Sequence, residues 1–171
     1  YEITCRDWSS DVCSSDRGLA AYGMTCCPCA QEMNIEYVQE IVQSRSDLNI
    51  SEEQLKKLLQ IIPVASHNQR AMGRIQIGFN NLDKEVVNVI DLIDVIEESM
   101  SARIRAVLKR PDEAELVRKA HLNPVFAEDT IRKMATSLAT DRFKHIPEDM
   151  TIKISIISYE SIHIHNVYAE L

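Results

Sequence analysis

The 171-residue sequence has few of the features that would place it outside the ordinary globular class. It contains only four glycines and five prolines, which excludes collagen-like and low-complexity chains. No apolar run approaches the roughly 20 residues of a membrane-spanning helix, and no secretory leader is visible at the start. The net charge of -7 argues against a general nucleic-acid binder, which usually carries a basic stripe. The 45% hydrophobic and 26% charged residues therefore predict one globular domain, with neither nucleic acid nor membrane as partner.

The segment 7–16, DWSSDVCSSD, does not fit the sequence around it. It holds the only tryptophan, four serines and three aspartates, and it has neither helical nor strand periodicity. It resembles the translation of a common sequencing-library adapter, and the alternative is a genuine polar loop. We therefore expect residues 1–17 to be spurious or of uncertain origin, the domain to cover residues 18–171, and the chain to be a C-terminal fragment.

Hydrophobic periodicity predicts an alternation of strands and helices. The expected strands cover 18–27, 65–80, 151–158 and 161–171, the expected helices cover 31–45, 52–61, 84–100, 111–121 and 125–139, and 102–108 is ambiguous. The predicted buried stripe of the helix at 84–100 consists of Val86, Val89, Ile90, Ile93 and Ile96. Ser51 and Gln54 form a capping-box pattern before the second helix. The last two strands predict an antiparallel hairpin, and the whole order predicts an α+β domain with helices packed on one face of an antiparallel sheet.

The motif Cys27-Pro28-Cys29 places two thiols one residue apart. One of them suits a zinc or iron ligand, because thiolates bind both metals. No second cysteine pair completes a zinc ribbon, so the alternative is a buried, reduced pair.

Three further polar motifs have structural explanations as well as chemical ones. The run from His67 to Arg70 opens a strand and also fits a surface strand end. Glu113 and Glu128 each lie in the first turn of a predicted helix, where the helix dipole alone favours a carboxylate. The chemical interpretation makes Glu113 a metal ligand and Glu128 a carboxylate that accepts two N–H donors from a guanidine-like edge.

The stretch from Glu160 to His165 is the most informative. His163 and His165 are predicted to share one face of a strand, because residues i and i+2 align. Two imidazoles beside a carboxylate suit proton transfer near neutral pH or metal binding, whereas the alternative is the exposed polar face of an edge strand. Taken together, the motifs indicate metal-assisted hydrolysis or a metal-binding domain.

Five blocks in the same order resemble the type IB GTP cyclohydrolases, a family that includes the archaeal enzyme of methanopterin biosynthesis. The blocks are Cys27-Pro28-Cys29, His67 to Arg70, Leu108 to Glu113, Asn123-Pro124 with Phe126 to Asp129, and Glu160 to Asn166 running into Tyr168-Ala169. The long helical segment at 30–66 and the sequence around Cys27 are closer to the archaeal branch. The resemblance implies a tunnelling fold, in which the sheets of several subunits form an oligomeric barrel with active sites at subunit interfaces.

The resemblance also implies a role for each matching residue. Cys27, His67 and Glu113 correspond to the ligands of one divalent metal ion, Fe(II) if the chain is of the archaeal type and otherwise Zn(II) or Mn(II). Glu128 corresponds to the guanine anchor. The proton-transfer group corresponds to Glu160, His163 and His165. Few basic residues are candidates for the triphosphate, and Arg70 is the one assigned to substrate binding.

The implied activity opens the imidazole ring of GTP and releases formate in the cytoplasm. The product is a 7,8-dihydroneopterin 2',3'-cyclic phosphate in the archaeal type and a 7,8-dihydroneopterin triphosphate in the bacterial type. The family carries two such modules per chain and only the second is expected here, which leaves open whether the fragment is active alone. The alternatives are another pterin or deazapurine enzyme of the same fold, or a non-catalytic purine- or metal-binding module.

Overall fold

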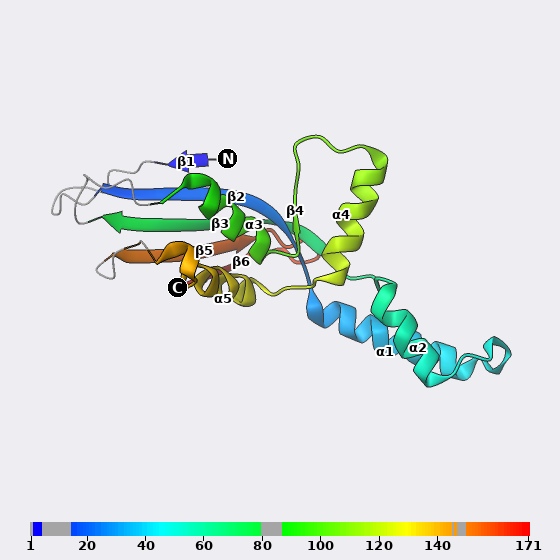
Figure 1. The fold of residues 1–171 in the computed structure, drawn as a ribbon. Helices are drawn as coiled ribbons and strands as arrows, with labels where there is room; N and C mark the ends of the chain where they lie inside the picture. Colours follow the sequence, from blue (N-terminus) through cyan, green and yellow to red (C-terminus); the bar gives the residue numbers. More distant parts are fainter. Residues whose placement is uncertain (1, 5–14, 80–86, 145, 147–149) are drawn as a thin grey trace.

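A computed structural model describes residues 2–4, 15–79, 87–144, 146 and 150–171 (Figure 1). Most of the suspect segment 7–16 lies outside the described residues. The strands are β1 (Glu2–Thr4), β2 (Ser15–Cys26), β3 (Asn68–Phe79), β4 (Ala102–Arg103), β5 (Thr151–Ser158) and β6 (Val167–Glu170). The helices are α1 (Pro28–Ser44), α2 (Glu52–Ile61), α3 (Val89–Ser99), α4 (Arg110–Leu122) and α5 (Ala127–Leu138), with short 3-10 turns at Ser46–Leu48 and Asp141–Phe143.

The strands form one antiparallel sheet in the order β1-β2-β3-β5-β6, with β4 paired to the end of β2. β2 and β3 pair along their whole length, from Ser15 opposite Phe79 to Cys26 opposite Asn68. β5 continues the sheet, with Ser158 opposite Ala71, and β6 completes the predicted hairpin with β5. The α+β class and the antiparallel sheet predicted from the sequence are therefore confirmed.

Helices α3 and α5 pack together on one face of the sheet (Figure 1). Their apolar side chains and those of β2, β3 and β5 form the main core, which includes Ile75, Ile96, Met134 and Ile156. α3 approaches closely because β3 carries a glycine beneath it: a Cβ at Gly73 would lie 2.6 Å from Cγ2 of Ile96. The predicted packing of helices on one face is confirmed for these two helices.

α1 and α2 extend away from the sheet as a helical pair, and α4 lies beside the end of β2 (Figure 1). α1 starts three residues before the predicted start, because Pro28 occupies its first turn, where a missing N–H costs nothing. The predicted capping box of α2 is present: the Gln54 N–H donates to Ser51 Oγ, and the Ser51 N–H donates to Gln54 Oε1. Among the described residues, no helix is long and apolar enough to cross a membrane.

α3 differs from its predicted extent and buried face. It begins at Val89, because the side chain of Asn88 accepts the N–H of Ile90 and caps the first turn. Val89 and Ile90 are exposed, whereas Ile93 and Ile96 are buried as predicted. Val86, the remaining member of the predicted stripe, lies outside the described residues.

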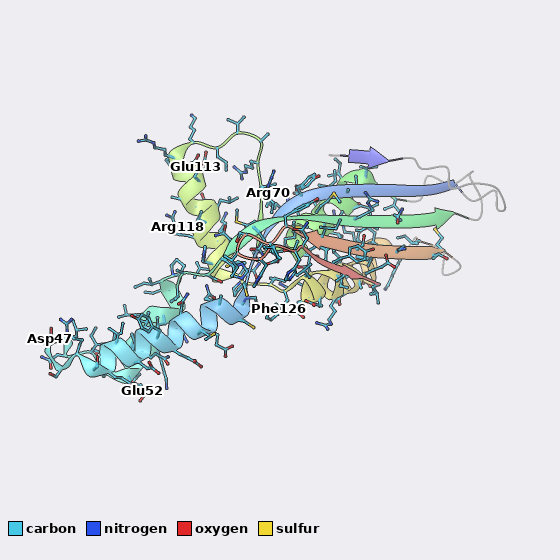
Figure 2. The ribbon with its side chains drawn as sticks, turned by 180° about the vertical axis from the view of Figure 1, so that it is seen from behind. Asp47, Glu52, Arg70, Glu113, Arg118 and Phe126 are labelled. Atoms are coloured by element: carbon cyan, nitrogen blue, oxygen red, sulfur yellow. The ribbon has the colours of Figure 1, made fainter. Side chains whose placement is uncertain are left out.

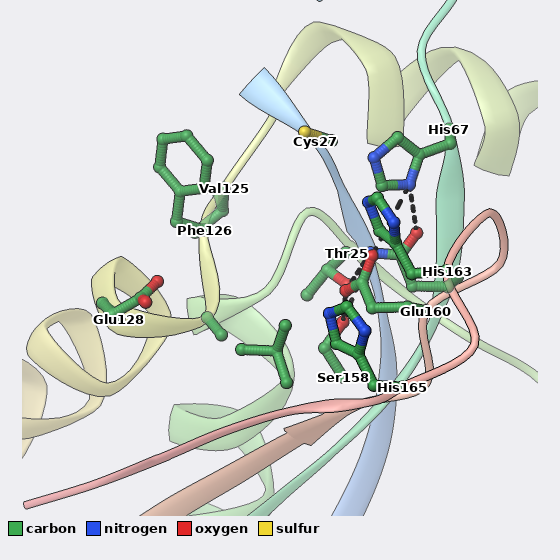
Figure 3. Close-up of a pocket in the computed structure, with 13 residues that line it drawn as sticks. Thr25, Cys27, His67, Val125, Phe126, Glu128, Ser158, Glu160, His163 and His165 are labelled. Atoms are coloured by element: carbon green, nitrogen blue, oxygen red, sulfur yellow. Dashed lines mark hydrogen bonds and ion pairs between the residues drawn. The ribbon is translucent and has the colours of Figure 1, made fainter. Parts of the chain in front are cut away.

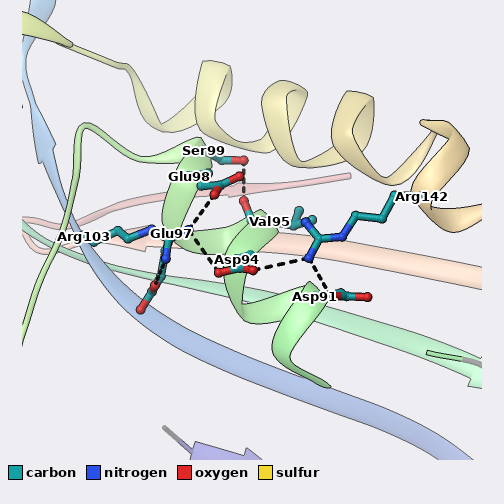
Figure 4. A network of polar contacts seen from close by, with 8 residues as sticks. All are labelled: Asp91, Asp94, Val95, Glu97, Glu98, Ser99, Arg103 and Arg142. Atoms are coloured by element: carbon teal, nitrogen blue, oxygen red, sulfur yellow. Dashed lines mark hydrogen bonds and ion pairs between the residues drawn. The ribbon is translucent and has the colours of Figure 1, made fainter. Parts of the chain in front are cut away.

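Ion pairs tie α3 to the segments on either side of it (Figure 4). Arg103 of β4 reaches Asp94 and Glu98, and Arg142 in the 3-10 turn after α5 reaches Asp91 and Asp94. Exposed pairs of this kind contribute about 0–1 kcal/mol each, so they orient α3 more than they stabilise it.

The prediction of a continuous strand over 161–171 is wrong. Only Val167–Glu170 is a strand, and residues 161–165 form a series of bends. The chain leaves the extended path after Tyr159, and the carboxylate of Glu160 is held by Ser158 and Gln69 at the end of the sheet. His163 and His165 consequently do not share a strand face, although bends bring them to the same place.

Candidate active site

A cavity of about 230 Å³ lies where β2 and β5 end and β3 begins, opposite the start of α5 (Figure 3). Each of the three strands contributes a polar side chain to its floor: Thr25, Gln69 and Ser158. The register explains this convergence, because Thr25 pairs with Gln69 and Ser158 pairs with Ala71 two residues further along. Residues that are far apart in the sequence thus form one polar surface.

Three of the predicted site residues lie close enough together to bind one metal ion. His67, Glu160 and His163 each offer one ligand atom within 4.8 Å of the others. The imidazole of His67 and the carboxylate of Glu160 are largely buried, with side-chain exposures of 11% and 8%, and His67 Nδ1 lies 3.8 Å from Glu160 Oε2. A buried carboxylate is costly unless its charge is compensated, so a cation bound between Glu160 and the imidazole nitrogens would stabilise this arrangement.

An amide joins the histidine to the carboxylate (Figure 3). Nδ1 of His67 lies 2.9 Å from Oε1 of Gln69, and Nε2 of Gln69 donates to Oε1 of Glu160 at 3.0 Å. Ser158 Oγ also donates to Glu160 Oε1 at 2.9 Å and lies 3.1 Å from Thr25 Oγ1. The carboxylate is therefore held in place by partners from two strands.

The two histidines of the bend stack on each other at the mouth of the cavity. Their ring centroids are 5.3 Å apart with an interplanar angle of 19°. The ring of His163 also meets that of His67 edge to face, with centroids 6.0 Å apart. His163 and His165 are exposed, so both can exchange protons with solvent while they line the cavity.

Cys27 lines the same cavity, as the residue that caps the N-terminus of α1. Its backbone N–H donates to the carbonyl of His67 at 3.1 Å, which ties the thiol to the histidine segment. Its sulfur is not among the ligand atoms that lie within 4.8 Å of one another. The neighbouring Cys26 is buried on the other side of β2, and burial is the largest cause of its raised pKa. Cys29 is exposed on α1 and does not line the cavity.

The other predicted site residues separate into one that joins the cavity and two that do not. Glu128, in the first turn of α5, lines the wall opposite the histidines (Figure 3). Glu113 is exposed on α4 and does not line the cavity, and Figure 2 shows it far from Phe126 at the cavity wall. Arg70 follows Gln69 on β3 and so points to the opposite face of the sheet, where it lines a second cavity with Tyr22 and Arg105.

Sequence reasoning assigned no role to three residues that build this site. Gln69 and Ser158 are buried polar residues, and the signal that could have found them is a polar residue at an inward position of an alternating strand. Phe126 exposes its ring at the cavity wall and could be recognised only from the position of α5.

The donor set fits a divalent transition metal. Zinc and iron take imidazole nitrogens, carboxylates and thiolates as ligands, and manganese takes the carboxylate. His67, Glu160 and His163 supply the first two kinds, and Cys27 supplies the third from the same cavity. The residues that line this cavity therefore fit a divalent metal ion.

The antiparallel α+β fold and this imidazole, carboxylate and thiol site are those of a chain suited to metal-assisted chemistry on a small ligand. Residues 1–169 match the family described as type I GTP cyclohydrolase folE2, and the chain belongs to this family. The resemblance found in the sequence motifs is thus confirmed.

Several relatives are named GTP cyclohydrolase MptA. The protein of Methanosphaera stadtmanae is 41% identical over 153 residues, which cover 90% of this chain and 47% of the relative. A protein of Methanocella arvoryzae, named GTP cyclohydrolase MptA 2, is 43% identical over 155 residues, covering 90% of this chain and 48% of the relative. That of Methanocaldococcus jannaschii is 38% identical over 158 residues, with shares of 90% and 47%. The chain spans about half the length of the relatives that it matches.

Proposed function

We propose that this chain contributes the active site of a GTP cyclohydrolase. The observation that carries the proposal is that Glu128 lies across one cavity from the group formed by His67, Glu160 and His163. One side offers a carboxylate suited to a purine edge, and the other offers groups suited to hydrolysis. Membership of the family and the relatives named GTP cyclohydrolase MptA support the same reaction.

The cavity favours a base over a whole nucleotide. Its volume of about 230 Å³ is below the ~300–1,000 Å³ of pockets that enclose drug-sized ligands. The two oxygens of Glu128 would accept the N1–H and the amino N–H of guanine, a pattern that adenine does not offer. Val125 and Phe126 form the apolar wall beside Glu128, against which the base would lie.

The polar floor is suited to the proton transfers of ring opening. Addition of water at C8 and cleavage of the imidazole ring need one group that takes a proton from water and one that gives a proton to the ring nitrogen. Glu160, His163 and His165 lie on the histidine side of the cavity and can hold or move these protons. Release of C8 as formate uses a second water and the same groups.

We assign His67 and Cys27 as ligands of one divalent metal ion, with Glu160 and His163 in reach of the same position. When bound, such an ion lowers the pKa of water into the neutral range. Fe(II) is our expectation for an archaeal-type protein, with Zn(II) and Mn(II) as the alternatives. A cytoplasmic setting would keep the Cys27 thiol reduced.

Glu113 can act as a metal ligand, and Arg70 as a substrate-binding residue, only in an oligomer of this chain. Both lie away from the cavity of their own chain, so we propose that they act on a cavity of a neighbouring subunit. This agrees with the expected tunnelling fold, a homo-oligomeric barrel with sites at subunit interfaces. The relatives named GTP cyclohydrolase MptA support the archaeal type, for which our expected product is the 2',3'-cyclic phosphate and not the triphosphate.

Two measurements test the proposal. The chain, loaded anaerobically with Fe(II), Zn(II) or Mn(II), is expected to bind GTP more tightly than ATP and to release formate with pterin fluorescence. Glu128→Gln should remove the preference for GTP, because an amide cannot accept both N–H donors, whereas Glu36→Gln on the exposed side of α1 should leave it unchanged. Equal binding of GTP and ATP by the unmodified chain would contradict the proposal even if turnover requires a longer protein.

A further inference from the structure

We propose that Gln69 is a positioning residue that holds the proton of neutral His67 on Nδ1 and thereby presents a free Nε2 to the cavity. The proposal concerns hydrogen bonds within the protein, so it does not depend on GTP chemistry. Only its consequence for metal affinity rests on the proposed function.

Glu160 fixes the orientation of the Gln69 amide. A carboxylate can only accept hydrogen bonds, so the group that faces Glu160 Oε1 at 3.0 Å must be the NH₂ of Gln69. The same NH₂ lies 3.3 Å from Ser158 Oγ. The reverse orientation would place the amide oxygen against the carboxylate oxygen, with two acceptors facing each other and no proton between them.

Ser158 does not permit the reverse orientation of the Gln69 amide, because it has no proton left to donate to it. Its hydroxyl donates to Glu160 Oε1 at 2.9 Å, so its single proton is already used. Ser158 Oγ is therefore the acceptor for Gln69 Nε2, and Thr25 is the donor in the contact of 3.1 Å between Thr25 Oγ1 and Ser158 Oγ. Every hydrogen bond in this group thus runs toward Glu160.

The orientation of the Gln69 amide in turn determines which nitrogen of His67 carries the proton. With the NH₂ of Gln69 facing Glu160, the amide oxygen faces Nδ1 of His67 at 2.9 Å. An amide oxygen can only accept, so Nδ1 carries the proton and Nε2 keeps its lone pair. A histidine that is free in water mainly places its proton on Nε2, so the protein has selected the less common form. Nε2 is then the atom that can bind a metal ion or accept a proton.

The position of Gln69 makes it suited to this role. Its side chain is buried, and its backbone is fixed within the β2–β3 ladder opposite Thr25. Little freedom is left for the amide to turn over or to leave. Orienting partners of this kind usually affect metal affinity about 10–100-fold, although they do not touch the metal.

The unmodified chain provides the first test. Proton–nitrogen correlation spectra of the chain labelled with [¹⁵N]histidine, assigned by the loss of signals in His67→Ala, report which ring nitrogen of His67 carries the proton. We expect protonated Nδ1 and unprotonated Nε2 in the metal-free protein above the titration range of the ring. A proton on Nε2 would overturn the proposal without any variant of Gln69.

Three variants provide the second test, with Zn(II) affinity measured by competition with a chelator. Gln69→Leu keeps the size of the side chain but offers no acceptor, so it should return the proton to Nε2 and weaken Zn(II) binding about 10–100-fold. Gln69→Glu keeps an oxygen that accepts from Nδ1, and a proton held between its other oxygen and Glu160 replaces the amide N–H, so the His67 proton should stay on Nδ1. Gln76→Leu, on the same strand but on its other face, is the matched control and should change neither readout.

The outcomes separate positioning from a general structural role. If Gln69→Leu weakens Zn(II) binding while His67 keeps its proton on Nδ1, or if Gln69→Glu moves the proton as Gln69→Leu does, the proposal is wrong. Should Gln69→Leu fail to fold, the spectrum of the unmodified chain and that of Gln69→Glu still decide the question. The absence of GTP turnover in the unmodified chain would bear on the proposed function alone.

Discussion

At the scale of single residues, the site depends on which side of a strand or helix each side chain occupies. Adjacent residues have different fates: Gln69 faces the cavity whereas Arg70 faces away from it, and Cys26 is buried whereas Cys27 lines the cavity. Successive residues of an extended chain point in opposite directions, so one position along the strand changes the chemistry completely.

The cysteines of the Cys-Pro-Cys motif should therefore behave differently toward metal. Cys27→Ala is expected to lose its bound metal on dialysis, because it removes the only thiol that lines the described part of the cavity. Cys29→Ala is the matched control and should retain metal, because Cys29 is exposed on α1. Metal content per chain, measured by elemental analysis after dialysis, decides the point. Stoichiometric metal in Cys27→Ala would contradict its assignment as a ligand.

At the scale of elements, the close approach of α3 to β3 depends on Gly73. A methyl group there would meet the branched and stiff side chain of Ile96, so Gly73→Ala should lower the free energy of unfolding by about 1–3 kcal/mol. Urea unfolding measures the loss. Because the clash is with Ile96, the double variant Gly73→Ala/Ile96→Ala should lose less than the sum of the two single variants. Strict additivity would show that the clash is absent.

The helical pair α1–α2 offers a prediction of a different kind. α2 buries little beyond Leu55, so its stability depends strongly on its capping box. Ser51→Ala should weaken α2 by about 1 kcal/mol, and hydrogen exchange of the α2 amides should speed up about five-fold, with β3 unaffected. Ser44→Ala, which changes an exposed serine near the end of α1, is the control. Equal exchange in α2 of Ser51→Ala and of the unmodified chain would show that tertiary packing holds the helix.

At the scale of the whole molecule, one chain supplies only part of the predicted constellation. Glu128 reaches the cavity of its own chain, whereas Glu113 and Arg70 do not. If Arg70 acts in a neighbouring subunit, Arg70→Met and Glu128→Gln each impair GTP binding, and mixing the two proteins after partial unfolding and reassembly should restore some intact sites. Titration with GTP measures the recovered sites. Mixtures that bind no better than either variant would place Arg70 and Glu128 outside a shared site.

The fold was largely predictable from the sequence, because local patterns specify local structure. The alternation in β5 and the capping box of α2 each act over a few residues, so both could be recognised without a structure, whereas the start of α1 at Pro28 was missed by three residues. The predictions were wrong where the structure of a segment depends on residues far away in the sequence. Val89 and Ile90 fit a helical stripe but find no partner in the core, and the alternation over 161–165 does not show that Glu160 is held by residues of β3 and β5 and that bends follow it.

The chemical groups of the site can be read from the sequence alone: the thiol of Cys27, the imidazoles of His67 and His163 and the carboxylates of Glu128 and Glu160. The order of motifs that marks the family can be read there too. Which of these groups meet depends on the tertiary structure. It brought Glu160 to His67 through the amide of Gln69, placed Glu128 across the cavity, and left Glu113 and Arg70 elsewhere. The physical reason is that strand register and helix packing set distances between residues about 90 positions apart, and no local pattern contains that information.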